Sequence, residues 1–177
     1  MTVTDSTAKK VVFCRYIELR KRRSRMDPIV SELVERLRGN LGASAVTMDT
    51  EHQYTAEMEG FLLMVHYLED SGQILLATCV APLPQGEREN IFLALLQGQY
   101  FFQRTSGATL AVDNEASFIV LQAVYSLRLL TAGSFIHAVE RFMQAAEYWR
   151  NECEKLANAG PEETDVQAVM LASGLRV

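Results

Sequence analysis

The spacing of apolar positions changes several times between residues 27 and 160, and each change marks a predicted element. Asp27 and Pro28 open the first helix, because Asp is a frequent N-cap and Pro belongs in the first helical turn. Gly42 ends this helix, since glycine adopts the backbone conformation of a helix C-terminus without strain. The helix carries a wide apolar stripe, formed by Ile29, Leu33, Leu37 and Leu41 with Val30 and Val34 beside it.

Three strands are predicted after this helix. Residues 54–58 alternate apolar and polar positions, which is typical of a strand with one buried face. Residues 61–68 (FLLMVHYL) and 73–80 (QILLATCV) are apolar on both faces and flank a turn signal, so they predict an antiparallel hairpin. One face of this hairpin can pack against the domain's own helices. The other face needs a subunit or a ligand chain to cover it.

A second helix is predicted from about Glu87 to Phe102. Its apolar residues extend beyond one stripe, which indicates burial on more than one side. A symmetric dimer interface accounts for this excess, and a helix enclosed within one subunit is the alternative. The residues predicted to form the interface are Phe92, Leu95, Leu96, Gln99 and Phe102.

The remaining pattern predicts two strands and a long helix. The strands cover residues 108–112 and 117–129, and a polar turn joins them. The helix covers residues 134–157 and repeats apolar residues at alternating spacings of four and three. About three heptads favour a helix laid on a sheet over a coiled coil. The order α-β-β-β-α-β-β-α predicts an α+β fold, in which helices flank a twisted antiparallel sheet.

Charge divides the chain into unequal parts. Residues 1–26 carry eight Lys or Arg and two Asp or Glu, whereas residues 27–177 carry nine and twenty. The acidic body disfavours nucleic acid as a partner and suits a basic or polar polypeptide. We expect residues 1–26 to be a flexible extension, with a nucleic-acid or membrane-surface contact as the alternative. Residues 27–157 form the predicted domain, and residues 158–177 form a tail that frays or adds a short helix.

Side chains suited to catalysis or metal binding do not gather in any motif. His52, His66 and His137 fall in different predicted elements, and none has a second ligand at metal-binding spacing. Three cysteines without a CxxC pair argue against a disulfide framework or a zinc site and favour reduced thiols in a cytoplasm. No apolar run approaches the ~18 residues of a membrane span. The sequence therefore predicts neither a cofactor nor a metal nor an enzyme, although catalytic groups that meet only in the folded chain stay possible.

Two stretches resemble the class I type III secretion chaperones, the Tir-chaperone-like family. The first is residues 95–113 (LLQGQYFFQRTSGATLAVD), in which a helix ending in two leucines leads through a small turn to the strand ATLAVD. The second is residues 142–150 (FMQAAEYWR), which is similar to the A-E-x-W ending of that family. Gln99 replaces a frequent Asn, and Ser106-Gly107 replaces Gly-Gly, but the amide and one permissive glycine remain.

This resemblance implies a cytoplasmic homodimer that uses no nucleotide. It would bind the N-terminal segment of a secreted effector, adding strand to the sheet edge, and keep that segment non-globular and export-competent. A non-secretory dimeric regulatory module of the same fold is the alternative. Client contacts are predicted on elements with more apolar surface than one core needs, at Val30, Val34, Met64, His66, Leu75 and Ala77.

Overall fold

Six antiparallel strands form a single sheet in the computed structural model, which describes residues 27–40, 46–50, 53–86, 88–115 and 117–158. The strands lie in the order β1-β2-β3-β4-β6-β5. Their bounds are β1 Val46–Thr50, β2 Gln53–Met58, β3 Phe61–Leu68, β4 Gln73–Pro82, β5 Thr109–Asp113 and β6 Phe118–Ser126. Strands β1 and β5 are therefore the two edges of the sheet.

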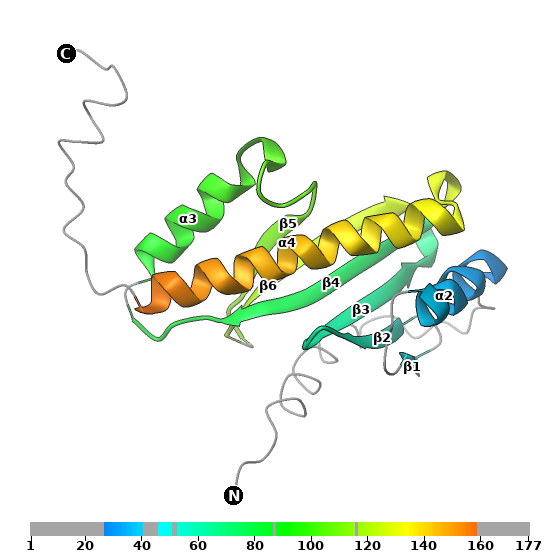
Figure 1. Cartoon of the computed structure of the whole chain (residues 1–177), viewed down its shortest axis with the longest axis horizontal. Coiled ribbons are helices and arrows are strands. Elements are labelled where there is room, and N and C mark those ends of the chain that lie inside the picture. The colour runs from blue at the N-terminus through cyan, green and yellow to red at the C-terminus, as the bar shows by residue number, and fades with distance from the viewer. Residues whose placement is uncertain (1–26, 41–45, 51–52, 87, 116, 159–177) are drawn as a thin grey trace, which may run out of the picture.

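Within the described residues, three helices accompany the sheet (Figure 1). Helix α4 (Ala132–Asn158) runs along the sheet over β4, and α2 (Pro28–Asn40) packs against α4 near one end. Helix α3 (Glu89–Gln99) lies at the other end, where it contacts α4 and β5. Short 3₁₀ turns follow at Glu69–Ser71, Tyr100–Phe102 and Leu127–Leu129.

The predicted α+β fold is confirmed, and the structure adds one strand to the predicted order. Strand β1 was not predicted, because five residues (VTMDT) without strong apolar alternation carry little signal. Helix α3 is shorter than predicted, since its last turn is the 3₁₀ turn at Tyr100–Phe102. The predicted extension at residues 1–26, the stop at Gly42 and residues 159–177 of the predicted tail lie outside the described residues.

Local hydrogen bonds explain where two helices begin. The Asp27 carboxylate accepts a hydrogen bond from the Ile29 backbone N–H at 2.8 Å, as expected of an N-cap. Thr131 and Ser134 exchange side-chain and backbone hydrogen bonds before the first turn of α4. This reciprocal arrangement resembles a capping box and starts α4 two residues before the predicted position.

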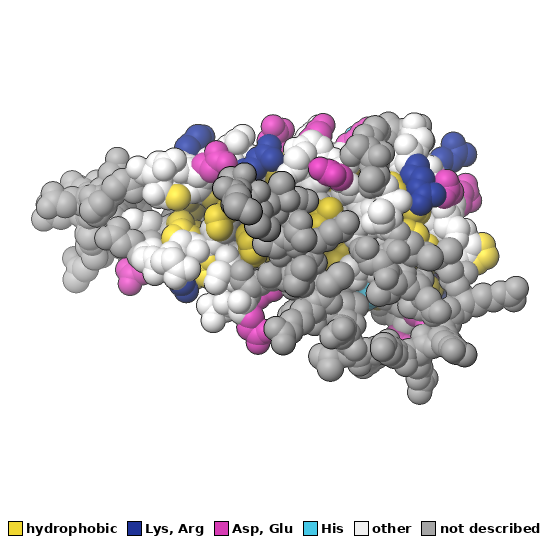
Figure 2. Space-filling model, turned by 90° about the horizontal axis from the view of Figure 1, so that it is seen from below, with side chains coloured by type: hydrophobic (Ala, Val, Ile, Leu, Met, Phe, Trp, Pro, Cys, Tyr) yellow, Lys and Arg dark blue, Asp and Glu magenta, His cyan; other side chains and the backbone are white. Residues whose placement is uncertain are grey.

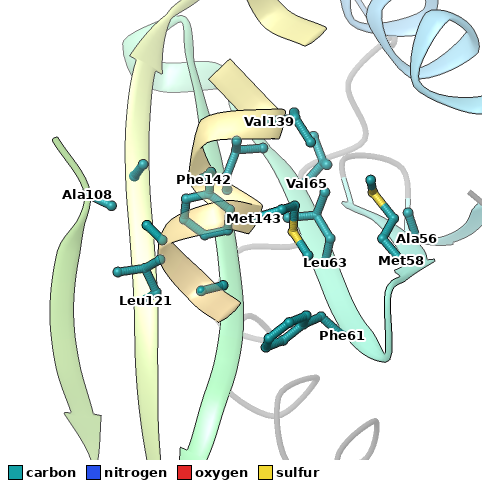
Figure 3. Packing of buried hydrophobic residues seen from close by; sticks show 14 of the residues in the cluster. Ala56, Met58, Phe61, Leu63, Val65, Ala108, Leu121, Val139, Phe142 and Met143 are labelled. Atoms are coloured by element: carbon teal, nitrogen blue, oxygen red, sulfur yellow. The ribbon is translucent and has the colours of Figure 1, made fainter. Parts of the chain in front are cut away.

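The core lies between α4, α2 and one face of the sheet. Val139, Phe142 and Met143 of α4 project toward the sheet, where Leu63, Val65 and Leu121 meet them (Figure 3). The apolar residues of α4, which are spaced alternately by four and three, form a stripe that packs on the sheet, as predicted. Its buried members are Phe135, Val139, Phe142, Ala146, Trp149 and Cys153, with Leu156 partly buried.

Trp149 fixes the position of α3 and of the turn that follows it. Its indole lies against Gly98, so closely that a Cβ on Gly98 would overlap the Cζ2 and Cη2 atoms of the ring. The indole Nε1–H donates a 2.9 Å hydrogen bond to the Arg104 backbone oxygen. One side chain of α4 therefore holds both the end of α3 and the following turn.

The Gly98→Ala variant should be strongly destabilised, because the indole and the helix backbone cannot both keep their positions around an added methyl group. Overpacking of this kind costs about 1–3 kcal/mol of unfolding free energy, measurable by urea denaturation. Gly39→Ala is the control, since Gly39 lies in α2 and a Cβ added there would meet no atom within 4 Å. Gly39→Ala should be neutral or stabilising by up to about 1 kcal/mol. Equal stability of the two variants would contradict this account of α3.

Candidate functional site

Large apolar side chains are exposed along α3 and the turn after it. Leu96 is 71% exposed and Phe101 is 74% exposed, although both are large apolar residues. A described surface with this many exposed apolar side chains is typical of an interaction site. The exposed apolar residues of this segment, called the α3 surface here, are Phe92, Leu93, Leu96, Tyr100, Phe101 and Phe102.

Three of the five predicted interface residues belong to the α3 surface, namely Phe92, Leu96 and Phe102. Leu95 instead faces the core and is only 6% exposed. Gln99 is half-buried and uses its side-chain amide within the subunit. Its Oε1 accepts from the Leu110 N–H at 2.8 Å, and its Nε2 donates to the Ala108 oxygen at 3.2 Å.

Sequence reasoning missed Leu93, Tyr100 and Phe101 as members of the α3 surface. The signal that could have revealed Tyr100 and Phe101 was the run of three aromatic residues, 100–102, at the end of the helix. Phe101 and Phe102 have positive φ values of 51° and 54°, which turns the chain sharply after α3. This left-handed conformation costs about 1–2 kcal/mol per bulky residue. The Tyr100 and Phe101 rings pack edge to face, with centroids 4.4 Å apart.

The predicted client-contact residues divide between the core and the opposite face of the sheet. Val30 and Val34 lie in the core cluster and are almost fully buried. Met64 and His66 alternate with Leu63 and Val65 of the core, so their side chains point away from the helices. The structure therefore separates the two α2 residues from the other predicted contacts.

Register brings the remaining four predicted residues together on the sheet face that points away from the helices, called the outer face here. Met64 pairs with Ala77, and His66 pairs with Leu75 on the neighbouring strand. Met64 and Ala77 are buried, whereas His66 and Leu75 are partly exposed. Val124 pairs with Leu75 and is exposed, and it was not predicted. Alternation along residues 118–126 was its only signal.

Seen from below, apolar side chains reach the surface at several places in the described part of the chain, among acidic, basic and uncharged polar side chains (Figure 2). The acidic excess of residues 27–177, with twenty Asp or Glu against nine Lys or Arg, suits a polypeptide with basic side chains. It does not suit a phosphate backbone.

Comparison with models of protein families matches residues 32–150 to the Tir chaperone protein (CesT) family. The chain belongs to the Tir chaperone (CesT) family. The resemblance seen in residues 95–113 and 142–150 is thereby confirmed. Comparison with curated protein sequences gives no match.

Solved structures show the same fold as this member of the Tir chaperone family. A chain of the ExsC-ExsE complex matches with a TM-score of 0.58 and 20% identity, covering 71% of this chain and 96% of that chain. A chain of the HopA1-SchA chaperone-effector complex gives 0.55 and 13%, covering 70% and 94%. A chain of the ExoT-SpcS complex from Pseudomonas aeruginosa gives 0.52 and 20%, covering 70% and 98%.

The described part of the chain offers no site for a metal ion. No cluster of three or more His, Cys, Asp or Glu side chains could hold a metal ion there. A hollow of about 340 Å³ lies between the turn at residues 103–106 and α4, but no acid, histidine or cysteine lines it. His137 is exposed beside Glu140, and His52 lies outside the described residues. None of the described helices is long and apolar enough to cross a membrane.

Cys153 should behave as a packed thiol and not as a nucleophile. Burial raises the pKa of the Cys153 thiol from 9.0 to about 11, and the charge of Glu152 adds to the rise. The folded state therefore binds this proton more tightly, so its contribution to stability is complete below pH 9.0 and falls as the pH rises toward 11. At pH 8, iodoacetamide should leave Cys153 unmodified in the folded chain and alkylate it in urea, as read by peptide mass spectrometry. Equal rates in both conditions would refute this assignment.

Proposed function

We propose that this chain is a cytoplasmic type III secretion chaperone, which binds the N-terminal segment of a secreted effector and keeps it non-globular and export-competent. The proposal rests on the large apolar side chains that this chain, a member of the Tir chaperone family, exposes along α3 and the turn after it. The match to a chaperone-effector complex, HopA1-SchA, supports it. The chaperone would act by mass action. Because it binds the extended state of the client segment, it shifts the client population toward that state. This role needs neither an enzyme active site nor a cofactor.

The α3 surface is proposed as the interface of a homodimer. A two-fold dimer buries the same patch on both subunits, so an exposed apolar helix can cover itself with its copy. Phe92, Leu96 and Phe102 supply the predicted contacts, and Leu93 with Phe101 extends them. Leu95 contributes from beneath by packing α3 on the core, and Gln99 contributes by holding α3 to β5.

The outer face is proposed as the client surface. His66 and Leu75 are its partly exposed centre, and Met64 with Ala77 forms its floor. Val30 and Val34 of α2 are buried in the core, so we do not place them in direct contact with a client. The negative charge of residues 27–177 favours client segments that carry basic side chains.

Leu96→Glu should convert the dimer into monomers. A carboxylate placed in a desolvated apolar interface is costly, while at 71% exposure in the subunit it leaves the core intact. Light scattering coupled to gel filtration measures the change. Leu129→Glu is the control, since Leu129 is an 82% exposed leucine outside α3 and should leave the dimer unchanged. A dimer that survives Leu96→Glu would show that α3 is not the interface.

Co-purification tests the proposed function directly. The tagged chain, expressed in its native host, should bring down one unprocessed secreted protein that is protected from protease only near its N-terminus. Leu75→Asp should reduce the recovered client about tenfold or more, because a charge would oppose apolar contacts at the centre of the outer face.

The same Leu75→Asp protein must keep its dimer mass and its melting temperature, or Leu75 belongs to the core. Leu129→Asp again serves as the exposed-leucine control and should recover the client fully. A clean dimer without a polypeptide, or one carrying nucleic acid or a small ligand, would favour a regulatory module or an enzyme instead.

A further inference from the structure

Three apolar side chains of the outer face are buried without belonging to the core. Met64, Ala77 and Val120 are 5%, 2% and 6% exposed, yet none of them is part of the core cluster. Met64 pairs with Ala77, and Val120 lies two residues from the partner of Ala77 on β6. Because side chains two residues apart point to the same face of a strand, these three form one patch across β3, β4 and β6, called the outer patch here.

The described helices do not account for the burial of the outer patch. The buried apolar side chains of α2, α3 and α4 all belong to the core cluster on the opposite face of the sheet. Side chains of a strand stand roughly perpendicular to the sheet, so water reaches them unless polypeptide lies over that face. Thr55, which pairs with Met64 on β2, is buried as well. A further stretch of polypeptide therefore has to cover this face.

The segment that precedes the described domain has a composition suited to this task. Residues 11–19 (VVFCRYIEL) are mostly apolar, and residues 20–25 (RKRRSR) are strongly basic. Residues 27–177 carry twenty Asp or Glu and nine Lys or Arg. An apolar segment joined to a basic one thus matches an apolar patch on an acidic domain.

The basic part of the segment joins the domain beside an acidic turn. Burial and the nearby Asp27 carboxylate raise the pKa of Tyr67, so the start of α2 lies near the end of β3. The turn after β3 carries Glu69 and Asp70, and both are exposed. Opposite charges within roughly 10 Å attract each other at moderate salt. Residues 20–25, which directly precede α2, are therefore drawn to this turn.

The chain is long enough to pass from α2 to the outer patch. Residues 20–26 span up to about 23 Å when extended. The route needs roughly 10 Å along β3, from Tyr67 to Met64, and roughly 10 Å from one face of the sheet to the other. Residues 11–19 come next along the chain, so they arrive over the outer patch.

The C-terminal segment fits this face less well. Residues 159–177 follow α4, which ends near α3 and far from α2 (Figure 1). They carry three Asp or Glu and one Arg, so their charge has the same sign as that of the domain. Both position and charge favour the N-terminal segment as the occupant.

We propose that residues 11–26 of this same chain occupy its outer face, in place of the flexible extension expected from the sequence. Residues 11–19 lie over the outer patch, and residues 20–25 lie against Glu69 and Asp70. Because the segment is tethered to α2, its binding is intramolecular and weak contacts hold it in place.

The consequence for a client rests on the proposed function. If a client binds the outer face, it must first displace residues 11–26 of the chaperone. A segment that occupies the face for roughly nine-tenths of the time lowers the apparent affinity for the client about tenfold. The chain would thus cover its own apolar face until a client that binds more strongly arrives.

Photo-crosslinking in the full chain tests the occupancy without a client. With a benzophenone amino acid in place of Phe13, irradiation should link position 13 to peptides of β3, β4 or β6. The product should keep the mass of one chain on a denaturing gel. The same probe in place of Val3 is the matched control and should give no link to these strands.

Three results of this experiment would overturn the proposal. A product of twice the chain mass would show that a second copy supplies the segment. No link from position 13 to the three strands would show that the face has another occupant. Equal links from positions 3 and 13 would show that the contact is not specific to residues 11–19.

Alkylation of Cys79 measures the same occupancy independently. Cys79 pairs with Val120 beside the outer patch, and it is a partly exposed free thiol. Ile17→Asp should detach the segment and speed the reaction of Cys79 with iodoacetamide about tenfold. Val3→Asp adds the same charge ahead of the segment and should leave the rate unchanged. An unchanged rate in Ile17→Asp would contradict the proposal.

Cys153 reports on the core in the same samples. It is buried in the core cluster and should stay unmodified in both variants. Alkylation of Cys153 in Ile17→Asp would show that the segment is needed for the core, and it would then not be a displaceable occupant of the outer face.

Client affinity separates this proposal from the proposed function. Ile17→Asp should bind the co-purified client about tenfold more tightly than the unsubstituted chain, and Val3→Asp should bind it equally. Equal affinity of Ile17→Asp and the unsubstituted chain would show that client and segment do not share a face. If no polypeptide co-purifies, the proposed function fails, whereas the crosslink and the alkylation rate still decide whether the segment occupies the outer face.

Discussion

The contact between Trp149 and Gly98 sets the geometry on which the interaction surfaces depend. It lets α3 approach α4 closely, and the indole hydrogen bond to Arg104 then holds the turn after α3 in place. From this fixed turn the chain enters β5, where Gln99 bonds to the strand. A larger residue at position 98 would push α3 outward and displace the turn and the edge strand with it.

This rigid attachment explains how a helix can present so much apolar surface without collapsing onto the subunit. Leu95 and Ile91 face the core, while Leu96 and Phe92 on the next positions face outward. Phe101 carries a conformational penalty through its positive φ and recovers little of it within the subunit, because its ring is exposed. Strain together with exposure is consistent with a surface shaped for a second chain.

Sequence pattern predicted the α+β fold and the position of α3, because long periodic segments outweigh local uncertainty. It could not separate Leu95 from Leu96, since a helix that is apolar on several sides gives no preferred direction. It placed Val30 and Val34 at a surface because it could not see α4 covering α2. Hydrogen bonds such as those of Gln99 to β5 join residues far along the chain and leave no periodic trace.

The two sheet edges lie far apart, and this separation constrains how a client can bind. Six strands spaced at about 4.8 Å place β1 roughly 24 Å from β5. In a dimer joined through α3, which lies at the β5 side, the two β1 edges would stand at the outer ends of the assembly. A single client segment reaching both would have to be extended over several tens of residues. Such a segment cannot fold into a compact domain while it contacts both edges.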